Sequence, residues 1–255
     1  MKKLFIRISI ALVILIILGV VAVGLFLDAA VKRGIETVGP MLTQVDVKLD
    51  SVSLSLLSGA GKVKGLLVGN PAGFNSASAI QVGNASLTLQ PSSVFSSKVV
   101  IRSINVQAPE ITYETDLKGN NLSKIRANLQ TAAGGAGGTS AKSDSRAGRK
   151  LQVDDFLISG GKIHVTVTAF GVKSATVPLP EIHLTGLGQG PDGITVAELT
   201  TQVIQAIEKA ALQVSSAAMA DLGKDAAGLT KGLGNTATGA ADKVTKGLGG
   251  LFKKN

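Results

Sequence analysis

The residue types that most often carry chemistry are few in this chain. It has two histidines, His164 and His183, and no cysteine, so a bound metal would depend on imidazole and carboxylate ligands. Glu181 stands two residues before His183, which places both side chains on one face of a strand. Two ligands can begin a metal site, but no third ligand or helical ligand motif accompanies them, and this favours ordinary strand histidines. Without a nucleophile-elbow serine or a paired-acid arrangement, the sequence predicts a protein that is not an enzyme and has no metal or other cofactor.

The segment Asn70-Pro71-Ala72-Gly73-Phe74 has the composition of a phosphate-binding loop. It lacks the closing Lys-Ser/Thr pair and the helix that such loops need, so we interpret it as a structural turn. Asn120-Asn121 is interpreted in the same way, as a turn with Asn121 capping a short helix.

The largest set of candidate binding residues is apolar. If these side chains line an open groove, acyl chains could lie on them while lipid headgroups stay in water. Alternation by itself equally predicts a closed core beneath the sheet. The groove candidates are Val52, Leu54, Leu56, Leu66, Val68, Ile80, Val82, Leu87, Leu89, Ile104, Val106, Ile163 and Val165.

A second set lies near the C-terminus, where lysines are interleaved with apolar residues. This pattern suits reversible contact with a lipid surface, although the many glycines equally favour a solvated, poorly ordered tail. The membrane-surface candidates are Lys231, Lys243, Lys246, Leu248, Leu251, Phe252, Lys253 and Lys254.

Most of the elements that would position these residues are strands. Apolar residues alternate with polar ones from Val45 onward, and the alternation slips by one position at Asp50-Ser51, which predicts a β-bulge or a short turn. Because no helix-length pattern separates successive runs, we expect antiparallel neighbours. The strand segments are 45–49, 52–56, 63–68, 80–89, 99–106, 111–113, 151–158, 162–168 and 175–184.

Helix patterns appear in three further places. Apolar spacing predicts helices over 29–42 and 122–129, and Thr195 with Glu198 has the spacing of a capping box that opens a third helix. We expect a mainly β protein divided into a cytoplasmic stub and anchor (1–28), the first part of the β domain (29–130), a flexible insertion (131–150), the second part of the β domain (151–191), an amphipathic helix (192–222) and a Lys/Gly-rich tail (223–255).

The N-terminus carries an apolar run from Ile8 to Leu27, about 20 residues, which is long enough for one membrane-spanning helix. A cleaved signal peptide is the alternative. The apolar region of a signal peptide is shorter, about 7–15 residues, and no clean A-x-A cleavage site follows this run. Lys2, Lys3 and Arg7 precede the run, which favours a cytoplasmic N-terminus. The net charge of +9 lies mostly at the periphery of the chain. No basic face with aromatic platforms appears, which argues against nucleic-acid binding.

Several landmarks occur in an order that resembles the N-terminal part of the AsmA-like family of membrane-anchored envelope proteins. After the apolar run they are Val38-Gly39-Pro40-Met41-Leu42, Val52-Ser53-Leu54-Ser55-Leu56, the segment 65–74 that ends in Asn70-Pro71-Ala72-Gly73-Phe74, Pro109-Glu110-Ile111 with Gly119-Asn120-Asn121-Leu122, and the segment 156–163. They extend over residues 1–185.

The resemblance implies a twisted, groove-forming β-sheet on the periplasmic side of the inner membrane of a diderm bacterium. It also implies a role in outer-membrane lipid homeostasis or assembly, because larger relatives carry lipids along an apolar groove. We therefore expect a single-pass inner-membrane protein whose partners are the lipid bilayer and phospholipid acyl chains. The alternative is a non-catalytic scaffold that recruits an envelope protein through sheet edges or the C-terminal helix.

Overall fold

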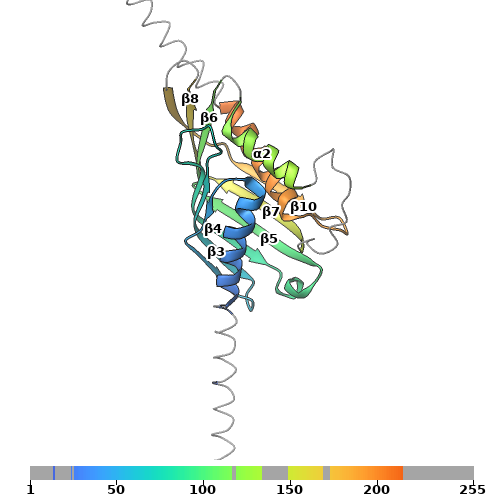
Figure 1. The fold of residues 1–255 in the computed structure, drawn as a ribbon. Helices are drawn as coiled ribbons and strands as arrows, with labels where there is room; N and C mark the ends of the chain where they lie inside the picture. Colours follow the sequence, from blue (N-terminus) through green and yellow to red (C-terminus); the bar gives the residue numbers. More distant parts are fainter. Residues whose placement is uncertain are drawn as a thin grey trace, which may run out of the picture. The chain divides into compact units, whose positions relative to one another are not determined.

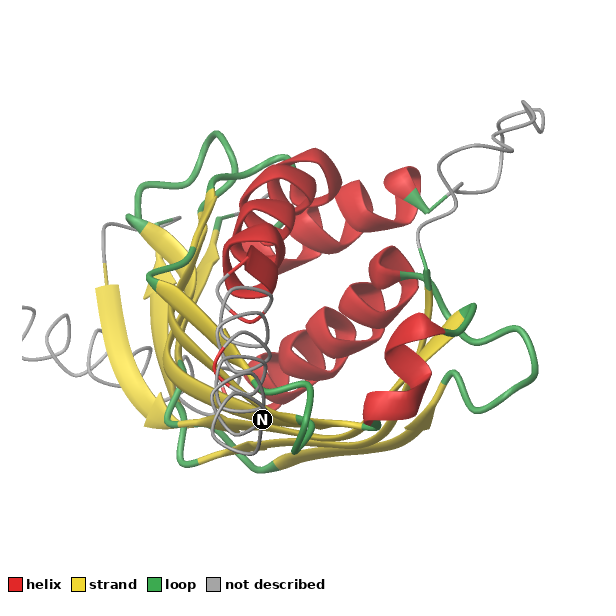
Figure 2. Cartoon of the chain, turned by 90° about the horizontal axis from the view of Figure 1, so that it is seen from below, coloured by secondary structure: helices red, strands yellow, loops and turns green. Residues whose placement is uncertain are grey.

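The strands form one curled, half-barrel sheet, and the helices lie against its concave face (Figures 1 and 2). The structure is a computed structural model that describes residues 14, 24, 26–116, 119–133, 149–168 and 173–214. The chain is mainly β, as expected, and the described residues up to Leu212 belong to one compact unit. Besides helices at 26–43 and 196–214, its elements are β1 (Val47–Lys48), β2 (Ser51–Leu54), β3 (Ala60–Gly69), β4 (Ser78–Leu89), η1 (Pro91–Phe95), β5 (Lys98–Gln107), β6 (Glu110–Thr115), α2 (Asn121–Ala132), β7 (Lys150–Ser159), β8 (Lys162–Val167), β9 (Lys173–Pro178) and β10 (Ile182–Leu187).

The strand order is β10-β7-β5-β4-β6-β8-β9, with β3 also beside β4 and both β1 and β2 beside β3. Most neighbours are antiparallel, but β5 pairs with β7 and β6 pairs with β8 in parallel. The expectation of an antiparallel sheet is therefore wrong at these two ladders. The cause is the connection from β6 through α2 to β7, which returns the chain to the end of the sheet where β5 began, as a crossover must.

The phase slip at Asp50 is a break between β1 and β2. It is not a bulge, because Lys48 pairs with Leu67 and Ser51 pairs with Lys64 in one unchanged register. Asp50 therefore faces Gly65, whose φ is 63°. A Cβ on that glycine would lie 1.9 Å from Asp50 Oδ2, so both the backbone conformation and the space require glycine.

The same irregularity continues across the whole sheet. On each strand one residue lies at the level of Asp50. The paired residues before and after that level keep the same register, so these residues lie opposite one another and form a row across the sheet. Positive φ values occur at Gly65, Ala108 and Gly160. The strands are interrupted at Asp50, Ala108, Gly160 and Pro180, whereas β3 and β4 continue through Gly65 and Gly83. The row consists of Asp50, Gly65, Gly83, Ala108, Gly160 and Pro180.

The row changes which side chains face the helices. Next to the row, Phe156 and Ile158 are buried before it, and Ile163 and Val165 are buried after it, so the buried positions adjoining the row change from even to odd. A strict two-residue period cannot do this, because one residue out of step moves every later side chain to the other face. An irregularity at the same level of the neighbouring strands lets one face stay apolar on both sides of it, with β3 and β4 continuing through the row at their glycines.

α2 covers the part of the sheet beyond the row. Leu122, Ile125 and Leu129 have no exposed surface, and they lie with the fully buried Ile111 and Ile163 in the core. The predicted helix is confirmed.

The cap of α2 is Asn120, whose side-chain oxygen accepts the Ser123 N–H at 2.8 Å. The prediction that Asn121 is the cap is wrong, because the Asn121 side chain is buried and bonded to β6. Asn121 Oδ1 accepts the Glu114 N–H at 3.0 Å, and its Nδ2 donates to the Thr112 carbonyl at 2.8 Å. Composition cannot distinguish two adjacent asparagines. The N-cap is the one whose side-chain oxygen accepts a backbone N–H of the first turn, and this depends on where the helix begins.

Helix 196–214 begins with the predicted capping box. Glu198 accepts the Thr195 N–H at 2.7 Å, and the Glu198 N–H donates to Thr195 Oγ1 at 3.1 Å. The helix is joined to α2 by Glu208, which forms an ion pair with Arg126 at 2.7 Å and accepts a hydrogen bond from Ser123. Helix 26–43 confirms the helix predicted over 29–42.

Several expectations fall on residues that the structure does not describe. The apolar run from Ile8 to Leu27 lies outside the described residues except at positions 14, 24, 26 and 27, and so do most of the insertion and all of the tail beyond residue 214. Among the helices that are described, none has both the length and the apolar character needed to cross a bilayer.

Candidate functional site

A cavity of about 430 Å³ lies between helix 26–43, the adjoining part of the sheet, α2 and the start of helix 196–214. It opens to solvent, because two of its lining residues, Val38 and Val196, keep 43% and 45% of their surface exposed. Its lining is almost wholly apolar. The lining residues are Val31, Gly34, Ile35, Val38, Gly39, Leu42, Thr43, Val47, Leu66, Val68, Leu129, Val196 and Thr200.

Helix 26–43 supplies the longest wall. Val31, Ile35, Val38 and Leu42 recur every three or four residues, so they form one stripe along the helix. From Val31 to Leu42 the stripe extends for about 16 Å at the usual helical rise. The cavity therefore has a long wall of side chains that cannot form hydrogen bonds.

A neighbouring face of the same helix holds it to the edge of the sheet. The strands β1 and β2 form that edge, and an uncovered edge would leave backbone N–H and C=O groups without partners. Three side chains one turn apart meet these groups. The contacts are Asp28 Oδ1 with Leu54 N (2.7 Å), Lys32 Nζ with Asp50 O (2.9 Å) and Glu36 Oε1 with Leu49 N (3.2 Å).

The two glycines of the wall differ in their surroundings. A Cβ on Gly39 would lie 2.9 Å from Val47 Cβ, so this glycine lets the helix approach β1 closely. A Cβ on Gly34 would meet nothing within 4 Å. Gly39 is therefore required by packing, whereas Gly34 leaves space at the cavity.

We expect Gly39→Ala and Gly34→Ala to change stability in opposite directions. Alanine in place of a helical glycine contributes about 1 kcal/mol, so Gly34→Ala should raise the free energy of unfolding by that amount. Gly39→Ala gains the same propensity but forces Val47 away, and we expect a net loss of about 1–2 kcal/mol. Denaturant unfolding of the full chain in detergent, followed by circular dichroism, measures both. Equal shifts in the two variants would contradict the close contact at Gly39.

The polar groups of the lining are already satisfied. Thr43 Oγ1 donates to the Gly39 carbonyl and Thr200 Oγ1 donates to the Val196 carbonyl, each at 2.8 Å. None of the described residues that line the cavity is charged. A polar ligand would lose its hydrogen bonds to water and gain none, whereas a hydrocarbon would lose only unfavourable contact with water.

The predicted groove residues are not all brought together. Leu66 and Val68 line the cavity, whereas Ile163 and Val165 have no exposed surface and belong to the closed core beneath α2. Val52, Ile80 and Val82 are also buried, and the others are partly exposed along the sheet: Leu54, Leu56, Leu87, Leu89, Ile104 and Val106. Both alternatives that alternation leaves open thus occur, each in a different part of the sheet.

The histidines lie apart on β8 and β10. His164 Nδ1 lies 3.0 Å from Thr176 Oγ1, and His183 Nε2 lies 2.5 Å from Asp155 Oδ1. Among the described residues no three potential ligands gather where they could hold a metal ion. His164 Nε2 also lies 3.6 Å from Glu110 Oε2, so His164 contacts one side chain on β9 and one on β6, whereas His183 contacts Asp155 on β7.

The loop of residues 70–76 is held by a group that sequence reasoning missed. Glu114 is only 1% exposed, and its carboxylate accepts the Asn75 N–H at 2.8 Å, the Ser76 N–H at 2.9 Å and the Ser76 hydroxyl at 2.6 Å. Asn70 Nδ2 lies 3.4 Å from the same carboxylate. The one sequence signal was an acidic residue directly after the predicted strand 111–113. The loop is a structural turn around a buried anion.

Comparison with known proteins adds no identification: no protein-family model, curated protein or solved structure matches this chain.

Proposed function

We propose that this chain is a membrane-anchored, AsmA-like envelope protein that binds the acyl chains of phospholipids in the cavity beside helix 26–43. The observation that carries the proposal is the open cavity, whose lining, over the part of the chain that the structure describes, offers no charge and no free hydrogen-bonding side chain. Such a site selects its ligand by shape and hydrophobicity, and a hydrocarbon tail is both narrow and apolar. In this proposal the protein binds acyl chains and catalyses no reaction on them.

The proposal also includes the setting. The apolar run that ends at Leu27 leads directly into the helix that forms the cavity wall, so an anchor there would keep the cavity beside the bilayer. In this arrangement the sheet lies on the periplasmic side of the inner membrane, and the protein contributes to lipid homeostasis or assembly of the outer membrane. The family resemblance supports this part.

Photolabelling tests the proposal. Full-length protein is reconstituted in vesicles that contain a phospholipid with a diazirine at the end of one acyl chain. After irradiation we expect labelled peptides from residues 31–42 and 66–68, mapped by mass spectrometry. Labels confined to residues 8–27 would show contact with the bilayer alone and would overturn acyl-chain binding in the cavity.

A further inference from the structure

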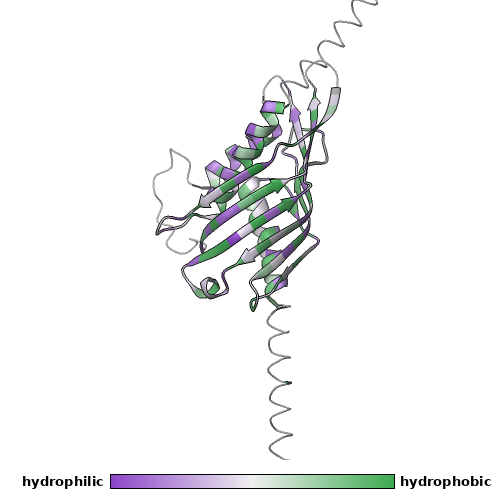
Figure 3. Cartoon of the chain, turned by 180° about the vertical axis from the view of Figure 1, so that it is seen from behind, coloured by the Kyte–Doolittle hydropathy of each residue, from purple (hydrophilic) through white to green (hydrophobic). Residues whose placement is uncertain are grey.

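The end of the folded unit at which helix 26–43 starts carries exposed large apolar side chains. Leu57, Phe95 and Phe26 are 83%, 83% and 78% exposed. Figures 1 and 3, which view the chain from opposite sides, both place the β2–β3 turn and η1 at this lower end. Single exposed apolar residues are common on protein surfaces, but three at one end, on separate segments, are a surface feature.

Hydrogen bonds establish that these segments are neighbours. The Leu54 N–H donates to Asp28 Oδ1 at 2.7 Å, so the end of β2 contacts the first turns of helix 26–43. The Leu89 N–H donates to the Gly59 carbonyl at 2.7 Å, which joins the turn at 55–59 to the end of β4. η1 follows β4 directly. We name the turn at 55–59 and η1 together the lower rim.

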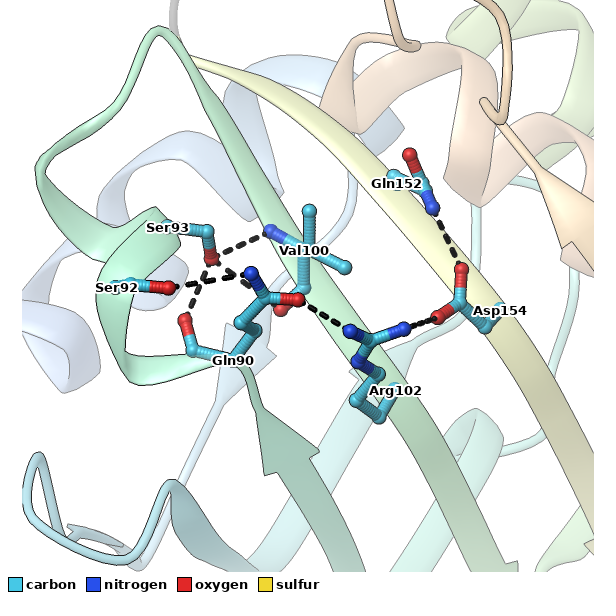
Figure 4. Close-up of polar contacts among 7 residues, drawn as sticks. All are labelled: Gln90, Ser92, Ser93, Val100, Arg102, Gln152 and Asp154. Atoms are coloured by element: carbon cyan, nitrogen blue, oxygen red, sulfur yellow. Dashed lines mark hydrogen bonds and ion pairs between the residues drawn. The ribbon is translucent and has the colours of Figure 1, made fainter.

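η1 is held rigidly at this rim (Figure 4). Ser93 is 5% exposed, and its hydroxyl donates to the Gln90 carbonyl at 2.7 Å and accepts the Val100 N–H at 2.9 Å. Arg102 braces the same corner, because it donates to Gln90 Oε1 at 2.5 Å and pairs with Asp154 at 3.0 Å. Phe95 is therefore held on a fixed turn, so little conformational entropy would be lost when its side chain enters an apolar environment.

The charge of the lower rim suits a lipid surface. Residues 52–60 and 89–98 contain no Asp or Glu. Arg149 donates to the Val94 carbonyl of η1, so one cation contacts this turn directly. A second cation, Lys98, follows η1 by three residues in the chain, and its side chain donates to the Gly190 carbonyl at 3.1 Å. Cations next to exposed apolar side chains fit the phosphates and upper acyl region of a membrane interface.

We propose that the lower rim rests on the bilayer that holds residues 8–27, with Leu57 and Phe95 inserted among the upper acyl chains. The apolar run ends one residue before Asp28, and Asp28 contacts the strand that leads into the rim, so a span ending there brings the rim to the bilayer surface. This inference rests on the anchorage included in the proposed function. It adds a second membrane contact that fixes the orientation of the folded unit, whether or not the cavity holds a lipid.

The absence of tryptophan from the chain allows a direct test. Leu57→Trp, Phe95→Trp and Leu212→Trp each introduce a single fluorophore into the full-length protein, reconstituted in vesicles with phospholipids brominated on the upper acyl chain. Leu212 is 47% exposed and lies about 18 Å along its helix from the cavity residue Thr200. Because helix 196–214 ends at the upper end of the folded unit (Figure 1), L212W is the matched control. We expect a blue shift and loss of emission for L57W and F95W, and neither for L212W.

Two results would overturn the inference, and they are distinguishable. Unquenched L57W and F95W in protein that resists extraction by alkaline carbonate would remove the rim contact but leave the anchor. Release of the protein by carbonate would remove the anchorage itself, and the proposed function would lose its setting as well.

Discussion

Glu114→Gln is expected to lower the free energy of unfolding by about 3 kcal/mol, since hydrogen bonds to a buried charged group contribute about 1.5–3 kcal/mol and unpaired donors would remain. The glutamine amide would point an N–H₂ group at a site where N–H and O–H donors from Asn75 and Ser76 converge. At least one donor would then lose its acceptor. Denaturant unfolding at neutral pH measures the loss.

Glu110→Gln is the matched control for this substitution. Glu110 lies on the same strand, but its side chain is 56% exposed. Its substitution should change stability by no more than about 0.5 kcal/mol, as is usual for surface positions. Equal effects of E114Q and E110Q would show that the carboxylate does not hold the loop at 70–76.

The same carboxylate makes stability depend on pH. Burial raises the pKa of Glu114, but hydrogen bonds from the Ser76 hydroxyl, the backbone of Asn75 and Ser76, and the Asn70 side chain outweigh it and hold the pKa below its ordinary value. A carboxyl with a lowered folded-state pKa stabilises the fold fully above its unfolded pKa of about 4.5, and this stabilisation is lost as the pH falls through the folded value. Between pH 7 and pH 3 the wild type should therefore lose more stability than E114Q, and parallel curves would contradict this.

Gly34→Leu is expected to reduce acyl-chain labelling in the cavity by about tenfold or more. Each methylene displaced from an apolar site costs about 0.8 kcal/mol, and a leucine side chain would displace several. The fold should not suffer, because a Cβ at this position meets nothing within 4 Å and leucine favours helix over glycine by about 1 kcal/mol. The photoreactive phospholipid and the thermal unfolding of the same samples give the two measurements.

Gly34→Ala is the control that separates the loss of cavity volume from the change in helix propensity. It gives a similar gain in helix stability but fills little of the cavity. We expect labelling of residues 66–68 to stay near the wild-type level in this variant. Labelling by the Gly34→Leu protein that equals that of Gly34→Ala would place the acyl chain elsewhere.

The sequence by itself determined the elements whose signals are local. The capping box at Thr195 and Glu198, the helical stripe from Val31 to Leu42 and the alternating strands each depend on neighbours within a few residues. Such periods follow from the 3.6-residue and 2-residue repeats of helix and strand, so they can be read without knowledge of the tertiary structure.

Only the tertiary structure decided which elements meet. The parallel pairing of β5 with β7 depends on a crossover whose path no local pattern specifies. The row of breaks needed the registers of all strands before the slip at Asp50 could be seen as one part of it. The burial of Glu114 required a loop almost 40 residues earlier in the chain to fold over it, since Ser76 lies 38 residues away. The cavity arose in the same way, because alternation makes a face apolar, but the position of the covering helices decides whether that face is closed or open.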